Sequence, residues 1–350
     1  MVQHEGVIMA CLHEYQRSAI RLVKRRVEDD FLSRPGVTAV DVGEKTRRGR
    51  PTGEAAVVVS VRQKHARPAG GIPALVDGVP TDVVEETIVL HRALLSPEGN
   101  STPVLGAERH TTVVGGIGVG PGRTVRLVPP DVAVAGDYVV VGTLGALLAP
   151  RGAPERVMGL TSFHVACVDD AWAVGDPVVH PSRPDGGCPC SDTVAVLSRA
   201  ALSHGVAAAA LSLLPVRGHR AEVVDVGPVR GTAEPVVGAR VRKRGRTTAL
   251  TSGVVVSTDA SVLVDFGEGL GMRVLRDQVR VASAERFTDF GDSGAVLVDD
   301  AGHVVGLHVA GSTTGLAGFA NPIAPVLRAL DVDLLVSGAG PGTGPAQDSR

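Results

Sequence analysis

Ser293 lies in the tetrapeptide GDSG, between Gly291 and Gly294. A serine hydroxyl is a poor nucleophile at its ordinary pKa, so it needs a base to take its proton and donors that stabilise an oxyanion. His164, in the stretch LTSFHV, is the candidate base. The backbone N–H groups of Gly291 and Ser293 are candidate oxyanion donors, because glycine at 291 lets the amide turn toward a substrate. The alternative is an ordinary turn between strands, for which Gly-Asp-Ser-Gly is common.

The elements that must position these residues fall into distinct parts. Apolar residues recur at three-to-four spacing from about Leu12 to Leu32, which predicts an amphipathic helix that ends at RPG (34–36). Two apolar runs follow, at 36–43 and 54–64, and predict a β-hairpin packed on the helix. The run VPTDVVEE (79–86) completes a small α+β module near residue 95. SPEGNSTP (96–103) has the composition of a linker.

The pattern changes from about residue 111 to residue 335. Short valine-rich runs recur there with Gly, Pro or Asp between them, and helical periodicity returns only at PIAPVLRAL (322–330). Many short strands separated by turn signals predict an all-β barrel or sandwich. The tail from residue 336 is rich in Gly and Pro and is expected to be disordered.

Composition limits the partners. The chain of 350 residues has a net charge of −2 and only 3% aromatic residues, which argues against nucleic-acid binding. Its start lacks a secretion pattern and no run reaches membrane-spanning length, so we expect a cytoplasmic protein without membrane partners. The basic run RVRKRGR (240–246) is expected to be a strand with its charges in water.

The cysteines are few. In a reducing compartment Cys11, Cys167, Cys188 and Cys190 are expected to be free thiols. The spacing of CPC (188–190) departs from that of zinc sites, so we expect neither a metal nor another cofactor.

Several blocks together resemble the chymotrypsin-like serine proteases, and within them the plant narrow-leaf trypsin-like proteins and their bacterial relatives. The resemblance covers about residues 30 to 335, in the blocks RPGVTAVDVGEK, TGEAAVVVSV, IPALVDGVPTDVVE, VVGGIGVG, GTLGALL, LTSFHV, DGGCPCSDTV, VRKRGRTTALTSGVV and GDSG. It implies a mainly β protein, with a small α+β module (1–95), a linker (96–110), a trypsin-like double β-barrel domain (111–335) and a tail (336–350). The implied activity is that of a serine endopeptidase acting on proteins or peptides; homo-oligomerisation is left open.

In this family a buried Asp orients the histidine, and its position is the weak point of the resemblance. Where family members carry a VDAAIA-like block, this chain reads HGVAAAALSLL (204–214), so that Ala207 stands at the acid's place. Asp225 and Asp192 are the candidate replacements. Two hypotheses follow: a serine endopeptidase with an incomplete triad, or a protease-fold binding or scaffold protein whose catalysis has decayed.

Specificity is predicted from the strand after the nucleophile. His308 in GLHVAGS stands where bacterial glutamate-specific proteases show a similar GIHWGG-type strand, whose histidine helps bind a substrate carboxylate. His308, Gly311 and Ser312 are therefore candidate substrate-binding residues, with a preference for Glu or Asp before the scissile bond. The alternative is a strand-edge histidine satisfied by backbone or water.

Overall fold

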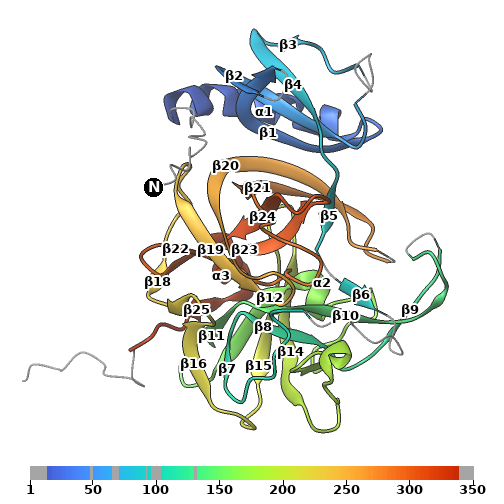
Figure 1. Ribbon diagram of the computed structural model, residues 1–350, viewed down its shortest axis with the longest axis vertical. Coiled ribbons are helices and arrows are strands. Elements are labelled where there is room, and N and C mark those ends of the chain that lie inside the picture. Colours follow the sequence, from blue (N-terminus) through green and yellow to red (C-terminus); the bar gives the residue numbers. More distant parts are fainter. Residues whose placement is uncertain are drawn as a thin grey trace, which may run out of the picture.

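The computed structural model describes residues 14–47, 50–64, 71–91, 93–95, 104–129, 132–267 and 269–338. The expected fold class is confirmed: the chain is mainly β, with a small N-terminal α+β unit. Figure 1 shows that unit in blue at the top, an orange and red barrel below it, and a green barrel at the bottom. The expected linker segment 96–103, Cys11, and the tail from residue 339 lie outside the described residues. No described helix is long and apolar enough to cross a membrane.

The N-terminal module (residues 14–86) is built as its periodicity predicts. Helix α1 packs on an antiparallel hairpin, and β4 adds a parallel strand beside β2. Apolar residues of the helix, among them Ile20, Val23 and Phe31, meet the buried valines of the hairpin in one core cluster. The elements are α1 (Glu14–Leu32), β1 (Val37–Arg47), β2 (Arg50–Val61), β3 (Leu75–Val76) and β4 (Val79–Glu85).

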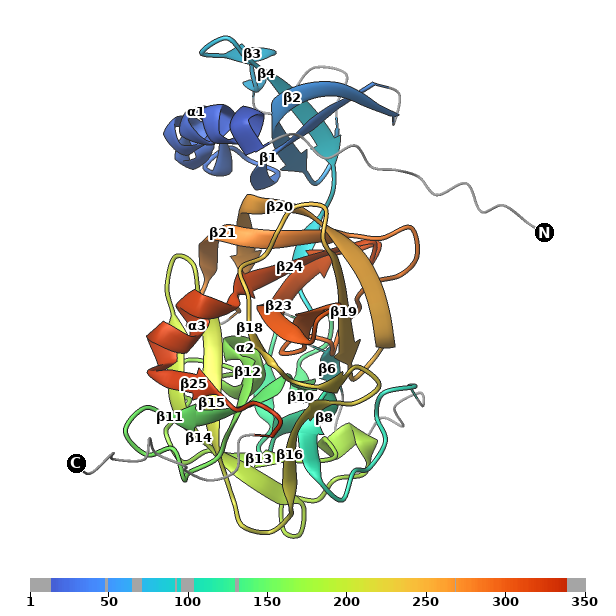
Figure 2. The ribbon, with the colours of Figure 1, turned by 90° about the vertical axis from the view of Figure 1, so that its left-hand side faces the viewer.

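The C-terminal barrel is a closed ring of six strands in the order β19-β22-β23-β24-β21-β20, with β20 pairing back onto β19. Strand β1 of the module pairs with β20, so the module extends the barrel's sheet (Figure 2). The elements are β18 (Gly231–Thr232), β19 (Arg240–Gly245), β20 (Ala249–Asp265), β21 (Met272–Ala282), β22 (Val296–Asp299), β23 (His303–Ser312), β24 (Ala317–Pro322) and α3 (Ile323–Leu330).

The N-terminal barrel follows the order β11-β12-β15-β14-β13-β8-β10, and β10 continues through Gly145 into β11. The elements are β7 (Val113–Gly115), β8 (Ile117–Pro121), β9 (Val125–Leu127), β10 (Gly136–Leu144), β11 (Ala146–Pro150), β12 (Met158–Ser162), α2 (Phe163–Ala166), β13 (Pro177–Val179), β14 (Thr193–Leu202), β15 (Ala207–Leu213), β16 (His219–Val223), β17 (Gly227–Pro228) and β25 (Val332–Leu334).

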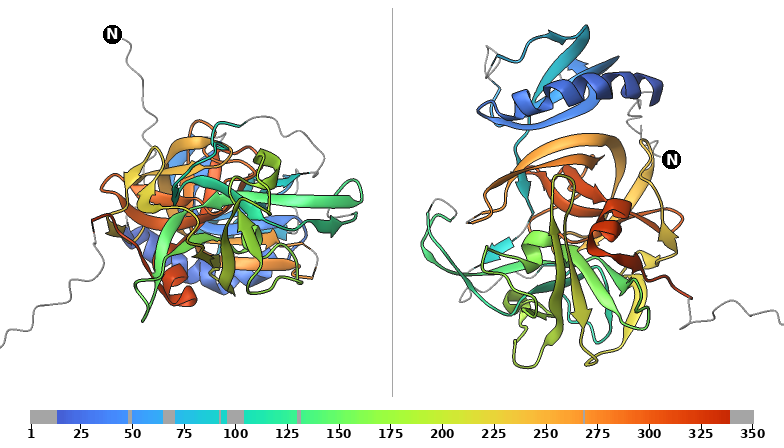
Figure 3. Two further views of the ribbon diagram at one scale, coloured as in Figure 1. Left: turned by 90° about the horizontal axis from the view of Figure 1, so that it is seen from below. Right: turned by 180° about the vertical axis from the view of Figure 1, so that it is seen from behind.

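A connecting segment joins the module to both barrels. β5 (Ile88–Leu90) pairs antiparallel with β23 of the C-terminal barrel, and β6 (Ala93–Leu95) pairs antiparallel with β10 of the N-terminal barrel. The right panel of Figure 3 shows the chain descending from the module along this route. Residues 88–95 therefore pass from one barrel to the other.

The expectation that the basic run 240–246 places its charges in water was wrong for three of its residues, although Arg240 is exposed. Lys243, Arg244 and Arg246 are buried because each meets a carboxylate: Asp292, Glu108 and Asp185, respectively. A long cationic side chain can be buried when it is paired and hydrogen-bonded. Residues 240–245 form β19, in which the adjacent Lys243 and Arg244 are both buried although neighbouring side chains of a strand point to opposite faces.

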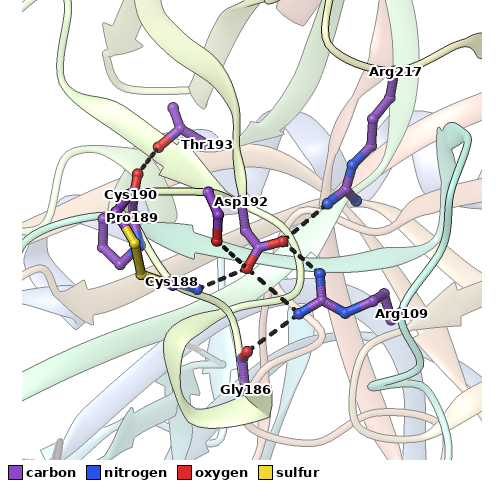
Figure 4. The surroundings of a disulfide bond; sticks show 9 residues. Arg109, Gly186, Cys188, Pro189, Cys190, Asp192, Thr193 and Arg217 are labelled. Atoms are coloured by element: carbon purple, nitrogen blue, oxygen red, sulfur yellow. Dashed lines mark hydrogen bonds and ion pairs between the residues drawn. A yellow bond between two sulfur atoms is a disulfide. The ribbon is translucent and has the colours of Figure 1, made fainter.

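The expectation of free thiols was also wrong for two cysteines. Cys188 and Cys190 form a disulfide in the loop before β14 (Figure 4). Cys167 remains a free thiol, and burial together with Asp176 raises its pKa to about 12, so it is kept as an inert thiol. Two cysteines separated by a single residue seldom form a disulfide with each other. The spacing of Cys188 and Cys190 therefore did not predict this bond.

Candidate active site

The Ser293 turn connects β21 to β22 in the C-terminal barrel. Gly291 and Gly294 have φ of 102° and 97°, a backbone region that L side chains rarely adopt. Ser293 is fully buried, and its hydroxyl donates to the Val309 carbonyl at 3.0 Å. The glycines thus make a sharp turn, in which the amide of Gly291 donates to the His91 carbonyl at 2.6 Å.

A buried ion pair supports this turn from below. The Asp292 carboxylate accepts from Lys243 Nζ at 2.9 Å, from the Thr248 hydroxyl at 2.7 Å and from the Thr247 amide at 2.9 Å. Although burial by itself raises the pKa of Asp292, Lys243 and these donors outweigh it and hold the pKa at about 2. Asp292 therefore stays ionised and fixes the turn. No local pattern in the sequence indicated that Lys243 is its partner.

His164 belongs to the short helix α2 of the N-terminal barrel and is fully buried, with its ring 5.9 Å from that of Phe266. The helix and the Ser293 turn both contact the end of β10. A Cβ on Gly142 would come within 2.3 Å of Val165 and 3.0 Å of the Ser293 carbonyl oxygen, and the Thr143 amide donates to that oxygen at 2.8 Å.

The two barrels thus bring together the segments that carry the candidate nucleophile and the candidate base. The Ser162 hydroxyl, two residues before His164, also donates to the His308 carbonyl at 2.8 Å. A direct hydrogen bond between the Ser293 hydroxyl and the His164 ring stays a prediction, since the hydroxyl is turned toward Val309.

His308 and His91 share one buried hydroxyl. Thr288 Oγ1 lies 2.6 Å from Nε2 of His308 and 2.9 Å from Nδ1 of His91. Burial, reinforced by the nearby His91 and by the Lys243 ammonium, lowers the pKa of His308 well below its ordinary value, and burial lowers that of His91 to about 4. Both rings are neutral at pH 7 and exchange hydrogen bonds through Thr288. Sequence reasoning missed Thr288 and His91, and the latter lies far from the other site residues along the chain.

The candidate acids lie in different surroundings. Ala207 begins β15, is fully buried, and shares a core cluster with Phe163 and Val165, which flank His164. Asp192 accepts from Arg109 and Arg217 and from the Cys188 amide (Figure 4), while Asp225 pairs with Arg244 at 3.4 Å and is 52% exposed. Both carboxylates are thus engaged by arginines, and the identity of the third residue stays a prediction.

A cavity of about 570 Å³ opens beside the site rather than at it. It lies between the N-terminal module and the C-terminal barrel, and is lined by Arg17, Asp41, Glu86, Arg280 and Ser312 among others. Ser293 and His164 are not among the residues that line it. Gly311 and Ser312 face that segment, in register with Val89 and Ile88.

Comparisons with known proteins find similarity at the level of structure. No family model matches the chain, and no curated protein does. Protease A of Thermobifida fusca is similar at 15% identity and a TM-score of 0.46, covering 65% of this chain and all of the other. These are similarities of fold.

Two further solved structures are similar in the same way. A glutamic-acid-specific serine protease, described as using a histidine triad in substrate binding, is 18% identical with a TM-score of 0.45, over 64% of this chain and all of the other. Cellulomonas bogoriensis chymotrypsin is 19% identical with a TM-score of 0.43, over 65% and 100%. The matched solved structures are thus chymotrypsin-like serine proteases.

Proposed function

We propose that this protein is a serine endopeptidase in which Ser293 is the nucleophile, His164 the base and Gly291 an oxyanion donor. One observation carries the proposal: the Gly291 amide, two residues before Ser293, donates at 2.6 Å to a peptide carbonyl, that of His91, whose own amide shares the Val309 carbonyl with the Ser293 hydroxyl. A donor placed where negative charge develops is the arrangement that stabilises the tetrahedral intermediate of acyl transfer.

The chemistry runs in two halves. The Ser293 oxygen attacks the substrate carbonyl carbon while His164 takes its proton, and the charge that develops on the carbonyl oxygen is held by the amides of Gly291 and Ser293. His164 then protonates the leaving amine as the C–N bond breaks. Water attacks the resulting acyl-enzyme and restores Ser293.

The third residue sets the expected rate. If Ala207 stands at the acid's place and neither alternative acid serves, the enzyme lacks the carboxylate that orients the base, and loss of that function lowers kcat by about 10⁴ in trypsin-like enzymes. Asp225 and Asp192 remain the alternative acids. We therefore expect a slow peptidase, which cleaves only the few peptide bonds that stay bound at the site for a long time.

The pocket favours an acidic residue before the scissile bond. This pocket is the space that the His91 ring occupies, beside His308 and the Thr288 hydroxyl. Phe287 stands in place of a carboxylate and lies under Lys243, with the ammonium 5.2 Å from the ring centre. A bound carboxylate would restore a proton to His308 and accept a charge-assisted hydrogen bond. His308→Ala is expected to reduce the preference for Glu or Asp; cleavage after basic or large apolar residues, unaffected by that change, would contradict it.

A fluorophosphonate probe, which labels an activated serine hydroxyl, tests the proposal once the connecting segment has been displaced from β23. Val89→Pro is expected to displace the connecting segment, since proline cannot donate to β23. Labelling of the folded Val89→Pro protein should disappear with Ser293→Ala added, and persist with Ser203→Ala, which removes an exposed serine. Folded Val89→Pro protein without labelling would favour the alternative, a decayed protease-fold binding protein.

A further inference from the structure

Residues 87–91 lie on β23 as a regular antiparallel strand. The Thr313 amide donates to the Thr87 carbonyl at 3.0 Å, and the His91 amide donates to the Val309 carbonyl at 3.4 Å. Val89, opposite Gly311, occupies the hydrogen-bonding position between them. β22 pairs only with residues 304–307 of β23, so this segment covers the remaining edge. Strand addition to an open edge is a general way in which proteins bind an extended peptide.

His91 is placed as the residue before a scissile bond would be. Its carbonyl oxygen accepts from Gly291, its amide donates to Val309, and its ring enters the pocket beside Thr288 and His308. A Cβ on Gly311 would come within 2.2 Å of the His91 ring. Glycine at 311 is therefore what leaves room for this side chain.

The chain continues across the junction of the barrels. Ala93, Leu94 and Leu95 pair with Val141, Val140 and Val139 of β10, the strand whose far end contacts the Ser293 turn. Residues before the His91 carbonyl thus bind one barrel, and residues after it bind the other. A substrate that spans a nucleophile must be held on both sides in this way.

We propose that the chain is its own substrate and cleaves the peptide bond on the C-terminal side of His91, which frees the cleft from the N-terminal module. The proposal rests on the proposed function. The Ser293 hydroxyl rotates away from Val309, its oxygen bonds to the His91 carbonyl carbon, and His164 takes the proton. The bond to the nitrogen of residue 92 breaks, and that nitrogen receives the proton. Water then hydrolyses the acyl-enzyme and leaves His91 as a carboxylate.

An incomplete triad, and a histidine where the pocket would prefer Glu or Asp, are compatible with this reaction because it is a single intramolecular turnover, in which the pairing of β5 and β6 holds the bond in place. A kcat of about 1 to 10³ s⁻¹ reduced about 10⁴-fold leaves about 10⁻⁴ to 10⁻¹ s⁻¹. The corresponding half-lives run from seconds to about two hours. Holding the bond against the oxyanion donor removes the cost of bringing substrate and enzyme together.

The module is held independently of this bond. β1 pairs with β20, and Asp259 of the barrel accepts from Arg17 of helix α1 at 2.7 Å. The two fragments are therefore expected to stay associated after cleavage. The cleft opens when the new end at His91 leaves β23.

Intact mass and N-terminal sequencing of the purified full chain test the proposal. Over hours at about neutral pH, the chain should convert to a fragment ending at His91 and one starting at residue 92. The rate should be unchanged over roughly a hundredfold range of protein concentration. Ser293→Ala should abolish conversion, and Ser203→Ala should leave it unchanged, with circular dichroism confirming that each variant is folded.

The outcomes separate the two proposals. A stable intact chain whose Val89→Pro variant is labelled by the fluorophosphonate would overturn self-cleavage and leave the peptidase function standing. A stable chain whose folded Val89→Pro variant is unlabelled would overturn both. Cleavage at another bond, or at a rate proportional to concentration, would overturn the intramolecular reaction after His91.

Discussion

The N-terminal module and the connecting segment each add a strand to the same barrel sheet, and the surroundings of the two additions differ. β1 pairs with β20 beside charged side chains, where Arg17 meets Asp259, and Lys24 and Glu28 meet Ser261. β5 pairs with β23 beside Gly291 and Thr288, whose amide and hydroxyl contact the backbone and the ring of His91, and the His308 ring lies 5.5 Å from the His91 ring. The first contact adds buried charged side chains to a short strand pairing and fixes the module's position.

The second contact is made largely through backbone groups and a pocket. Such groups recognise any extended chain and leave the choice of sequence to the pocket. Strand pairing alone therefore does not distinguish a docked strand from a bound substrate. The hydrogen-bond donors beside the strand, above all the Gly291 amide, make that distinction. Changes on the β5 side should alter cleavage, while changes on the β1 side should alter only how firmly the module is held.

The largest effect is expected from placing a carboxylate at the buried position 207, next to the residues that flank His164. Ala207→Asp should raise the rate of cleavage after His91 by up to about 10⁴-fold, because the carboxylate would fix the imidazole tautomer. Ala207→Asn is the matched control, with the same size and no charge, and should give no such gain. Equal rates for both folded variants would mean that another residue already serves as the acid.

Next in size is removal of the ammonium beneath the Ser293 turn. Lys243→Met leaves Asp292 buried without its ion-pair partner, which should lower the free energy of unfolding by about 3–5 kcal/mol. Urea unfolding followed by circular dichroism measures the loss. Arg240→Met, at an exposed position of the same strand, is the control. A loss below about 1 kcal/mol for Lys243→Met would contradict the role of the pair.

Acidification should weaken the binding of β5 and the His91 ring to the C-terminal barrel. Burial lowers the pKa of docked His91 to about 4, against 6.5 for a free histidine; Asp292 and Asp289 oppose this shift and Lys243 adds to it. The docked form disfavours the proton, so docking is fully favourable above about pH 6.5 and weakens as pH falls toward about 4. Between about pH 7 and pH 5 the loss is about 2 kcal/mol.

Histidine NMR titration of the Ser293→Ala protein, which stays intact, measures this shift. The His91 resonance should titrate near about 4, and near about 6.5 once Val89→Pro has displaced the segment. A midpoint at the ordinary value in both proteins would contradict docking of the ring in the pocket.

The smallest effect is expected at the exposed rim of the β1 side. Arg25 of helix α1 pairs with Asp277, and the two side chains are 42% and 52% exposed. Asp277→Asn should cost less than about 1 kcal/mol of unfolding free energy, because solvent screens such a pair, and asparagine tolerates the positive φ of this position. The rate of cleavage after His91 should not change. A slower cleavage would mean that the two strand additions are coupled.

The fold class could be predicted well from the sequence, because periodicity reports burial directly: helix α1, its hairpin and the valine-rich strands are all where their patterns indicated. Ser293 and His164 could be proposed because GDSG and LTSFHV are local motifs. Lys243 and His91 could not be found in this way. Each acquires its role from a partner far along the chain, Asp292 for the lysine and Gly291 for the His91 carbonyl, and one sequence carries no record of such pairs.

A crystal structure of the intact Ser293→Ala protein tests the central claim most directly, since it holds the chain before any cleavage. We predict that β5 lies on β23, with the His91 carbonyl oxygen within about 3 Å of the Gly291 amide and its ring beside Thr288. A cleft in which residues 88–91 lie elsewhere, with the Gly291 amide facing solvent, would contradict this claim.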